Sequence, residues 1–343
     1  MKVLVTGSAG FIGGYLVQEL LAQGHHVVGI DNFSKYGPVA KSYQHDARYQ
    51  FVQGDAKDVS LLSDLLADCD HFVAAAAKIG GITYFHEYAY DLFAENERLV
   101  ASACDAALAA YQHGNLQKIT LLSSSMVYEN ATVFPTPEGH QQQCPPPTST
   151  YGFQKLAAEY FVRGLHEQYG VPYTICRPFN CVGIGERRSL KHREIPSGNL
   201  KLAMSHVVPD LVQKTLRGQY PLHIFGSGEQ VRCYTYGGDL AKGIALAIFH
   251  PASRNEDFNL STRHATTVLE LAELIHGKVY AGRADAPEFR YVSEKPYSYD
   301  VQRRLPDVEK ARRMLGFEAT TDLSMMLDEV IPWIAEEVKA GRI

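Results

Sequence analysis

A glycine-rich turn near the start of the chain constrains the fold more than any other feature of the sequence. Residues 7–13 (GSAGFIG) lie between the apolar run Val3–Val5 and the helical stretch Phe11–Gln23. Without Cβ atoms such a turn can be tight, and its N–H groups can approach a pyrophosphate at the positive end of the helix. The turn predicts a dinucleotide-binding unit, and the alternative is that its glycines only tighten a turn. The expected contacts are Gly7, Gly10, Phe11, Ile12 and Gly13.

An acidic residue after the next apolar run bears on the choice of dinucleotide. Asp31 follows His26–Ile30, and a carboxylate at this place suits the ribose hydroxyls of adenosine and repels a 2′-phosphate. NAD is therefore favoured over NADP, although Lys35 nearby argues in the other direction. Asp55 either accepts a hydrogen bond from the adenine amine or caps a helix. Asn32, Asp55 and Ala75 complete the expected contacts at this end of the cofactor.

Short apolar runs alternate with helical stretches along the first half of the chain. The runs are continuous rather than alternating in polarity, which favours a parallel sheet covered on both faces. The order predicts an α/β fold, a Rossmann-type doubly wound parallel sheet, with residues 1–180 as the NAD-binding domain. The expected strands are Val3–Val5, His26–Ile30, Tyr49–Val52, His71–Ala77, Ile119–Leu122 and Tyr173–Cys176.

The alternation fades after about residue 180. Residues 184–200 are rich in charge, Pro and Gly, and we expect an irregular segment over a site. Residues 181–343 are predicted to form a smaller, mixed C-terminal substrate lobe, with the chain returning to the first lobe at about 235–262. Helices are expected at Val207–Leu216, Leu240–Phe249, Val268–His276, Asp307–Leu315 and Leu323–Val338.

Composition narrows the class of protein further. The 343 residues hold 33 Lys and Arg against 38 Asp and Glu, a net charge of −5 that argues against binding nucleic acid. The longest apolar runs fall short of the roughly 18–20 residues of a membrane span, and we expect neither a membrane segment nor a signal peptide. The six cysteines form no C-x-x-C pair, so we expect no metal site and a reducing cytoplasm.

A tyrosine and a lysine four residues apart carry the expected chemistry. Tyr151 and Lys155 share one face of a helix, and a Lys ammonium together with a positive nicotinamide ring favours the phenolate. Ser124 follows the run Ile119–Leu122, and strand ends at this edge of a parallel sheet face the cofactor crevice. We expect Ser124, Tyr151 and Lys155 to act in proton transfer, with Lys155 also contacting the cofactor.

At this point the chain resembles the extended short-chain dehydrogenases/reductases, the NAD-dependent nucleotide-sugar epimerases and dehydratases. Besides the glycine turn, Asp31 and the Ser-Tyr-Lys set, the resemblance rests on residues 177–180 (RPFN), on Val231-Arg232 before residues 238–240 (GDL), and on residues 304–307 (RLPD). It implies a nucleotide-diphosphate sugar between the lobes. It also implies that Asn180 and Arg232 hold the diphosphate with help from Arg304, since guanidinium forks suit phosphate oxygens. A surface ion pair is the alternative for either arginine.

Two stretches resemble particular subgroups. Residues 76–82 (AAKIGGI) look like a loop of GDP-fucose synthases and GDP-mannose 3,5-epimerases, which places Lys78 at the substrate. Residues 205–209 (SHVVP) resemble a fucose-synthase segment whose His is an acid in epimerisation at carbons 3 and 5. The partner base in those enzymes is a Cys at the place of Met126, and a thioether cannot take a proton. His206 is therefore expected either to contact substrate or to cap its helix.

Met126 also separates the chain from the resembling 4,6-dehydratases and UDP-glucuronate decarboxylases. These carry an acid where this sequence has Met126, next to Ser125, and we expect both residues to contact the substrate. Dehydration is disfavoured unless Glu129 or Cys181 substitutes for that acid. Glu129 stands where the family often has Gly, and a solvent-facing side chain is the simpler interpretation.

The remaining set supports oxidation at carbon 4, rotation of the 4-keto sugar and return of the hydride to the other face. The sequence thus predicts an NAD-dependent nucleotide-diphosphate-sugar 4-epimerase acting on a UDP- or GDP-sugar. The alternatives are a 4-keto-sugar reductase, a dehydratase with displaced acid and base groups, and a catalytically silent dinucleotide-sensing scaffold. Family habit implies a homodimer through helices at 92–112 and 152–168.

Overall fold

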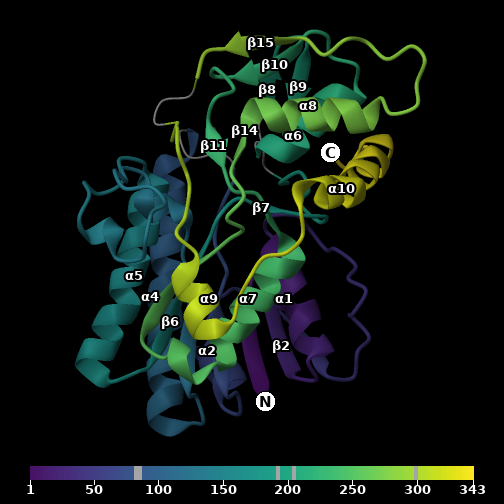
Figure 1. The fold of residues 1–343 in the computed structure, drawn as a ribbon. Helices are drawn as coiled ribbons and strands as arrows, with labels where there is room; N and C mark the ends of the chain where they lie inside the picture. The colour runs from purple at the N-terminus through teal and green to yellow at the C-terminus, as the bar shows by residue number, and fades with distance from the viewer. Residues whose placement is uncertain (81–86, 191–193, 203–205, 297–299) are drawn as a thin grey trace.

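The computed structural model describes residues 1–80, 87–190, 194–202, 206–296 and 300–343. Its centre is a parallel sheet of seven strands in the order β13-β6-β5-β4-β1-β2-β3, which confirms the expected doubly wound α/β fold (Figure 1). The strand of this sheet that comes last in the sequence, β13, pairs with β6 at one edge. The strands are β1 (Lys2–Thr6), β2 (His26–Asp31), β3 (Tyr49–Gln53), β4 (His71–Ala74), β5 (Lys118–Leu122), β6 (Tyr173–Pro178) and β13 (Glu256–Leu260).

Helices cover both faces of the sheet, which explains why its strands are apolar without alternation. In β1, Leu4 packs into the cluster under α2 (Val59–Leu66), α4 (Ala89–His113) and α5 (Thr150–Tyr169). Its neighbours Val3 and Val5 point to the opposite face, which is covered by α1 (Phe11–Ala22), α7 (Gly237–Phe249) and α9 (Glu309–Leu315). A strand that is buried on both faces cannot spare alternate positions for polar residues.

Local signals set the ends of several helices. Asp58 caps α2 by accepting a hydrogen bond from Leu61 N at 3.0 Å, and Asp322 caps α10 (Leu323–Lys339) in the same way. Thr267 and Glu270 form a reciprocal capping box at the start of α8 (Val268–Val279). These side chains satisfy backbone N–H groups that the first turn of a helix leaves without partners. The sequence analysis missed α2, whose eight residues give only two turns of periodicity.

The second lobe is built around a separate apolar cluster. Helices α6 (Val207–Leu216), α8 and α10 pack together over the parallel pair β10 (Leu222–Phe225) and β15 (Tyr291–Glu294). The segment 184–200, expected to be irregular, ends in the antiparallel pair β8 (Ile195–Ser197) and β9 (Leu200–Leu202). Two further small pairs are β7 (Cys181–Val182) with β12 (Thr235–Tyr236) and β11 (Val231–Arg232) with β14 (Thr266–Thr267). Short 3-10 helices are η1 (Ser125–Tyr128), η2 (His140–Gln142) and η3 (Pro251–Ser253).

A buried charge cluster joins β6, α5 and β13 beneath the site described below. The Arg177 guanidinium is fully buried and donates to both carboxylate oxygens of Glu159 at 2.7 Å, and it lies 2.6 Å from Asp257. Burial opposes the ionisation of Asp257, but Arg177 and Lys310 outweigh it and hold the pKa of that carboxyl well below its usual range. Removing one partner would leave a buried charge uncompensated, so the cluster fixes how the three elements meet.

Within the described residues, no helix is long and apolar enough to cross a membrane.

Candidate active site

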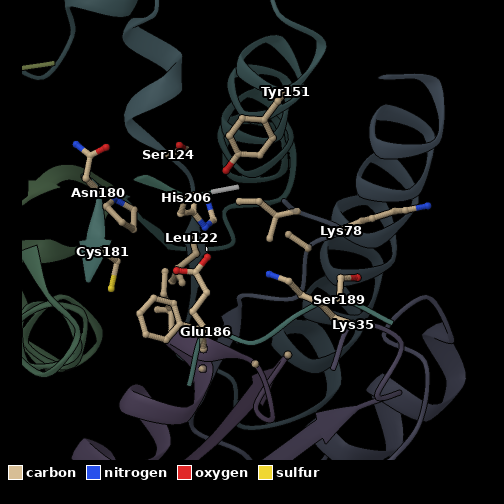
Figure 2. A pocket seen from close by; sticks show the side chains of 18 of the residues that line it. Lys35, Lys78, Leu122, Ser124, Tyr151, Asn180, Cys181, Glu186, Ser189 and His206 are labelled. Carbon is tan, nitrogen blue, oxygen red and sulfur yellow. Dashed lines mark hydrogen bonds and ion pairs between the residues drawn. The ribbon is translucent and has the colours of Figure 1, made fainter. Parts of the chain in front are cut away.

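A cavity of about 780 Å³ lies at the carboxyl ends of the central strands and extends under the second lobe. This is the edge where parallel α/β sheets bind ligands, because the connections from neighbouring strands part there. The lining combines backbone from the glycine turn with side chains from both lobes (Figure 2). It includes Gly7, Asp31, Ser124, Tyr151, Lys155, Asn180, Glu186, His206, Arg232 and Arg304.

The glycine turn is shaped by contacts that exclude side chains. Gly7 has φ +72°, and a Cβ on it would lie 3.0 Å from the Ala76 Cα. A Cβ on Gly10 would lie 3.0 Å from the Gly7 carbonyl oxygen, and one on Gly13 would overlap that oxygen. The turn is thus tight because positions 7, 10 and 13 are glycines. It leads into α1, and it lines the cavity. This arrangement fits a dinucleotide pyrophosphate, which the N–H groups and the positive helix end would hold.

The adenosine end of the cavity is organised by Asp31. Its carboxylate accepts hydrogen bonds from Ala9 N at 3.1 Å and Phe33 N at 2.8 Å, and it lines the cavity beside Asn32 and Lys35. Asp55 also lines the cavity and accepts from Lys57 N at 2.9 Å. The alternative that Asp55 caps a helix is wrong, because Asp58 caps α2.

Tyr151, Lys155 and Ser124 meet at the centre of the cavity. The Tyr151 phenol, 4% exposed, is hydrogen-bonded to the Ser124 side chain. The Lys155 ammonium lies 6.0 Å from the centre of the phenol ring and donates to the Leu122 carbonyl at 2.9 Å. Figure 2 shows the phenol entering from α5 with its hydroxyl towards the middle of the cavity. The geometry therefore brings together the three residues expected to act in proton transfer.

The charges of this set are governed by burial. Burial raises the pKa of Tyr151 to about 12, although the hydrogen bond from Ser124 and the charge of Arg304 lower it. Burial also lowers the pKa of Lys155 to about 8, against the opposing charge of Glu159. The protein's own groups therefore do not lower the pKa of Tyr151 as expected, because desolvation outweighs the charges around the phenol. The positive nicotinamide ring of bound NAD is the second charge that is expected to favour the Tyr151 phenolate.

Three predicted substrate residues form a connected group on the other side of the phenol. Arg304 places one guanidinium nitrogen 2.8 Å from the Met126 sulfur and another 3.4 Å from the Asn180 amide oxygen. Burial, together with the charge of Arg232, lowers the pKa of Arg304 to about 9. Arg232 is buried and donates to Asp300 at 3.1 Å, so the alternative of a surface ion pair is wrong for Arg232. Among the described residues, Arg304 forms no ion pair with a carboxylate.

His206 lines the cavity and is hydrogen-bonded to a carboxylate. It stands before α6 without capping it through its side chain, and its Nδ1 bonds to Glu186 from the segment after β7 (Figure 2). Burial opposes ionisation of Glu186, but His206 and Lys35 outweigh it and lower the pKa of that carboxyl. His206 thus occupies the N-cap position of α6, as the alternative expected, but its side chain bonds to Glu186 and makes no capping hydrogen bond. Ser205 lies outside the described residues.

The loop that resembles GDP-sugar enzymes is described only as far as Gly80, so Gly81 and Ile82 lie outside the described residues. The Lys78 backbone is held by Asn96, through N–H to Oδ1 at 2.7 Å and Nδ2 to carbonyl at 3.0 Å. The Lys78 ammonium lies 3.9 Å from Asp91 on α4. Lys78, Ser125 and Ala75 all line the cavity, as expected of residues that contact substrate or cofactor.

Sequence reasoning missed two charged residues of the site. Lys41 donates to the Gly10 carbonyl at 3.3 Å and so places its amine beside the glycine turn, although burial lowers its pKa to about 8. Asp300 lines the cavity and holds Arg232 from 68 residues away. Neither residue belongs to a motif or a periodic run, and only the fold brings them to the site.

The sequence profile described as the NAD dependent epimerase/dehydratase family matches residues 3–261. The chain belongs to this family. The family is NAD-dependent, which confirms the expected cofactor, and its members are enzymes acting as epimerases or dehydratases. The match spans the whole sheet, from β1 to β13.

Relatives within this family are 26–30% identical to this chain. The UDP-glucose 4-epimerase of Mycolicibacterium smegmatis is 30% identical over 94% of this chain and 95% of its own. The UDP-glucuronic acid decarboxylase 1 of Danio rerio is 26% identical over 98% of this chain and 73% of its own. The Bacillus cereus UDP-glucuronic acid 4-epimerase, solved with UDP-glucuronic acid and NAD, has a TM-score of 0.80 at 26% identity, covering 98% of this chain and 99% of its own.

Proposed function

We propose that this member of the NAD-dependent epimerase/dehydratase family is a nucleotide-diphosphate-sugar 4-epimerase that works through a transient 4-keto sugar. The observation that carries the proposal is the contrast between two neighbouring positions. Ser124, Tyr151 and Lys155 form a complete proton-transfer set. Position 126, beside them in the cavity, carries a thioether that contacts Arg304 and cannot exchange a proton.

The residues divide the work at carbon 4 of the sugar. Tyr151, as phenolate, takes the proton of the 4-hydroxyl through Ser124 and returns it when the ketone is reduced. Lys155 places positive charge beside the phenol ring, and this charge together with that of the bound nicotinamide ring would offset the burial that raises the pKa of Tyr151. When bound, NAD supplies the acceptor and later the donor of the hydride at carbon 4. The keto sugar rotates in the cavity between the two transfers, so the hydride is returned to the opposite face of carbon 4.

The arginines of the cavity suit the diphosphate of the substrate. Arg304 has no carboxylate partner in the described part of the chain, and a buried guanidinium without one favours a bound anion. Arg232 is kept in place by Asp300. We propose a UDP-sugar first, because related enzymes are solved with UDP-glucose and with UDP-glucuronic acid. The resemblance at Lys78 keeps GDP-sugars as the second class to assay.

One observation favours a second candidate, a dehydratase with displaced acid and base groups. The hydrogen-bonded pair of His206 and Glu186 lines the same cavity and could exchange protons at carbons beside a ketone. Of the two groups considered from the sequence, Glu129 does not belong to the described lining of the cavity, whereas Cys181 lines it but burial holds the pKa of its thiol far above the usual range. The second candidate thus depends on His206 and Glu186.

Turnover in D₂O separates the two candidates. A 4-epimerase returns the hydride that it removed, so the product should be inverted at carbon 4 with no deuterium on carbon, as read by NMR and mass spectrometry. Deuterium at carbon 3, 5 or 6, or loss of the mass of water, would contradict the proposal. Repeating the reaction with His206→Asn then shows whether His206 is the exchanging group.

We also propose that the chain forms a homodimer through α4 and α5. Four large apolar side chains of α5 stay exposed in one chain: Tyr160 at 61%, Tyr169 at 46%, Phe153 at 45% and Phe161 at 39%. Apolar side chains gathered on one helix are typical of an association surface. Sedimentation at several concentrations should give the mass of two chains, and Tyr160→Glu should shift it towards one.

A further inference from the structure

The carboxylate of Glu129 is directed at the first turn of the helix that carries Tyr151. One of its oxygens accepts from Thr148 N at 3.1 Å and from Ser149 N at 3.0 Å. Its other oxygen is hydrogen-bonded to the Ser149 hydroxyl. The earlier interpretation of Glu129 as a solvent-facing side chain is therefore wrong. Negative charge before a helix N-terminus is also favourable, because the backbone N–H groups there point towards it.

Ser149 links the Glu129 carboxylate to the backbone of α5. Its side chain caps α5 by accepting from Gly152 N at 3.0 Å, the residue directly after Tyr151. The hydroxyl can accept from Gly152 while it donates its own hydrogen to Glu129, so both interactions coexist. A continuous chain of hydrogen bonds thus runs from Glu129 through Ser149 to the backbone beside the phenol.

At its Glu129 end, this series of hydrogen bonds adjoins the segment that carries Ser124. Glu129 directly follows η1, whose own cap is Ser124 through a hydrogen bond from Met126 N at 3.2 Å. Glu129 N is tied back to the Met126 carbonyl at 3.1 Å. The Ser124 and Tyr151 hydroxyls therefore sit on two separate elements, and Glu129 connects these elements outside the cavity.

Gly152 lets the two elements approach closely. A Cβ at this position would lie 2.8 Å from the Met126 carbonyl oxygen and 2.9 Å from a carboxylate oxygen of Glu129. It would also lie 2.7 Å from the Pro147 Cβ. Because position 152 has no side chain, η1 and α5 can pack closely, and the Glu129 carboxylate lies at their contact.

We infer that Glu129 is a positioning residue for proton transfer: it fixes the start of α5 against η1 and so sets the distance between the Tyr151 and Ser124 hydroxyls. This inference rests on the proposed role of Tyr151. The Glu129 carboxylate bonds to the backbone of Thr148 and Ser149 and to the Ser149 hydroxyl, and Glu129 does not belong to the described lining of the cavity. Small displacements of a reacting group lower rates steeply, roughly a hundredfold for about 1 Å.

The test compares Glu129→Ala, Glu129→Gln and wild type, with Asp322→Ala as the matched control that removes the cap of α10. Glu129→Ala should lower kcat at least tenfold while KM and NAD affinity stay within about twofold. Glu129→Gln should recover part of kcat, because its amide oxygen still accepts from the two N–H groups. Asp322→Ala should lose stability only. Hydrogen exchange should become faster at Ser149 and Gly152 in Glu129→Ala, whether or not turnover is measured.

Gly152→Ala keeps the carboxylate and pushes the two elements apart, so it should lower kcat as well. It also replaces Glu129→Ala if that variant does not fold. Unchanged exchange at Ser149 and Gly152, or unchanged kcat in Glu129→Ala, would overturn the inference. An equal loss in the Gln and Ala variants would also overturn it, because the carboxylate itself would then react. If Tyr151→Phe keeps wild-type turnover, the proposed function fails, whereas the exchange result still judges the connection made by Glu129.

Discussion

The cofactor half of the cavity is shaped by backbone, whereas the substrate half is made of charged side chains. In residues 7–13 the surface follows from glycines whose Cβ atoms would collide with neighbouring backbone. Opposite them, Arg304 contacts Met126 and Asn180, and Arg232 contacts Asp300. The glycine turn is local in sequence, whereas the contacts of the substrate half join residues 68 to 178 positions apart.

This difference has a physical consequence for mutation. A backbone surface spreads binding over many N–H groups, so one side chain contributes a modest share of it. In the substrate half, each guanidinium carries a large share, because charge-assisted hydrogen bonds are the strong ones. Substitutions in the two halves should therefore differ in size and in the quantity that they change.

The largest effect is expected where the two halves meet. Tyr151→Phe removes the base and should lower kcat by roughly 10²–10⁴-fold, with NAD and substrate affinities close to wild type. The thermal midpoint should also stay near wild type, because the ring remains in place. Turnover and calorimetry check this. A variant retaining more than a tenth of the activity would identify another residue as the base, and a wild type without any turnover would favour the sensing scaffold.

A smaller effect is expected in the substrate half. Arg304→Met removes the guanidinium proposed to bind the diphosphate and should weaken nucleotide-sugar binding by roughly a hundredfold. Without ligand the same variant should melt at a higher temperature, because the folded state no longer buries a guanidinium charge. Burial lowers the pKa of Arg304 to about 9, so this gain should be full below pH 9 and shrink above it. Binding and melting curves over pH 7–10 test both expectations.

The smallest effect is expected in the cofactor half. Asp31→Ala removes one charge-assisted contact to the ribose and lifts repulsion of a 2′-phosphate, so the NADP/NAD affinity ratio should rise by roughly tenfold or more. Binding itself should persist, because the glycine turn remains. Titration of both dinucleotides measures the ratio. An unchanged ratio would show that Asp31 does not face the ribose, and loss of all binding would break the contrast between the two halves.

The same contrast explains what could be predicted from the sequence. The glycine turn, Asp31, and the pair Tyr151 and Lys155 depend on spacing within one strand, turn or helix, so they could be found in the sequence. The parallel sheet could be predicted because strands buried on both faces are apolar throughout. The contact of Arg304 with Met126 spans 178 residues and leaves no periodic signal.

The cap of α2 and the partners of Glu129 could not be predicted from the sequence. Asp55 and Asp58 are both acids near the start of α2, and only the structure shows that Asp58 is the cap. The sequence favours a solvent-facing Glu129, because nothing in it marks the residues that the carboxylate binds. Its partners Thr148 and Ser149 lie about twenty residues ahead, and an extended loop returns them to it.

β13 is synthesised after the other six strands of the central sheet, so the sheet cannot be completed until late in translation. At about 5–20 residues per second, the roughly 80 residues between β6 and β13 take about 4–16 seconds to synthesise. During that time the outer edge of β6 is unpaired and Arg177 lacks Asp257, although Glu159 has already been made. An open apolar strand edge invites pairing with other chains. The nascent chain therefore passes through an aggregation-prone stage, which closes when residues 256–260 join the sheet.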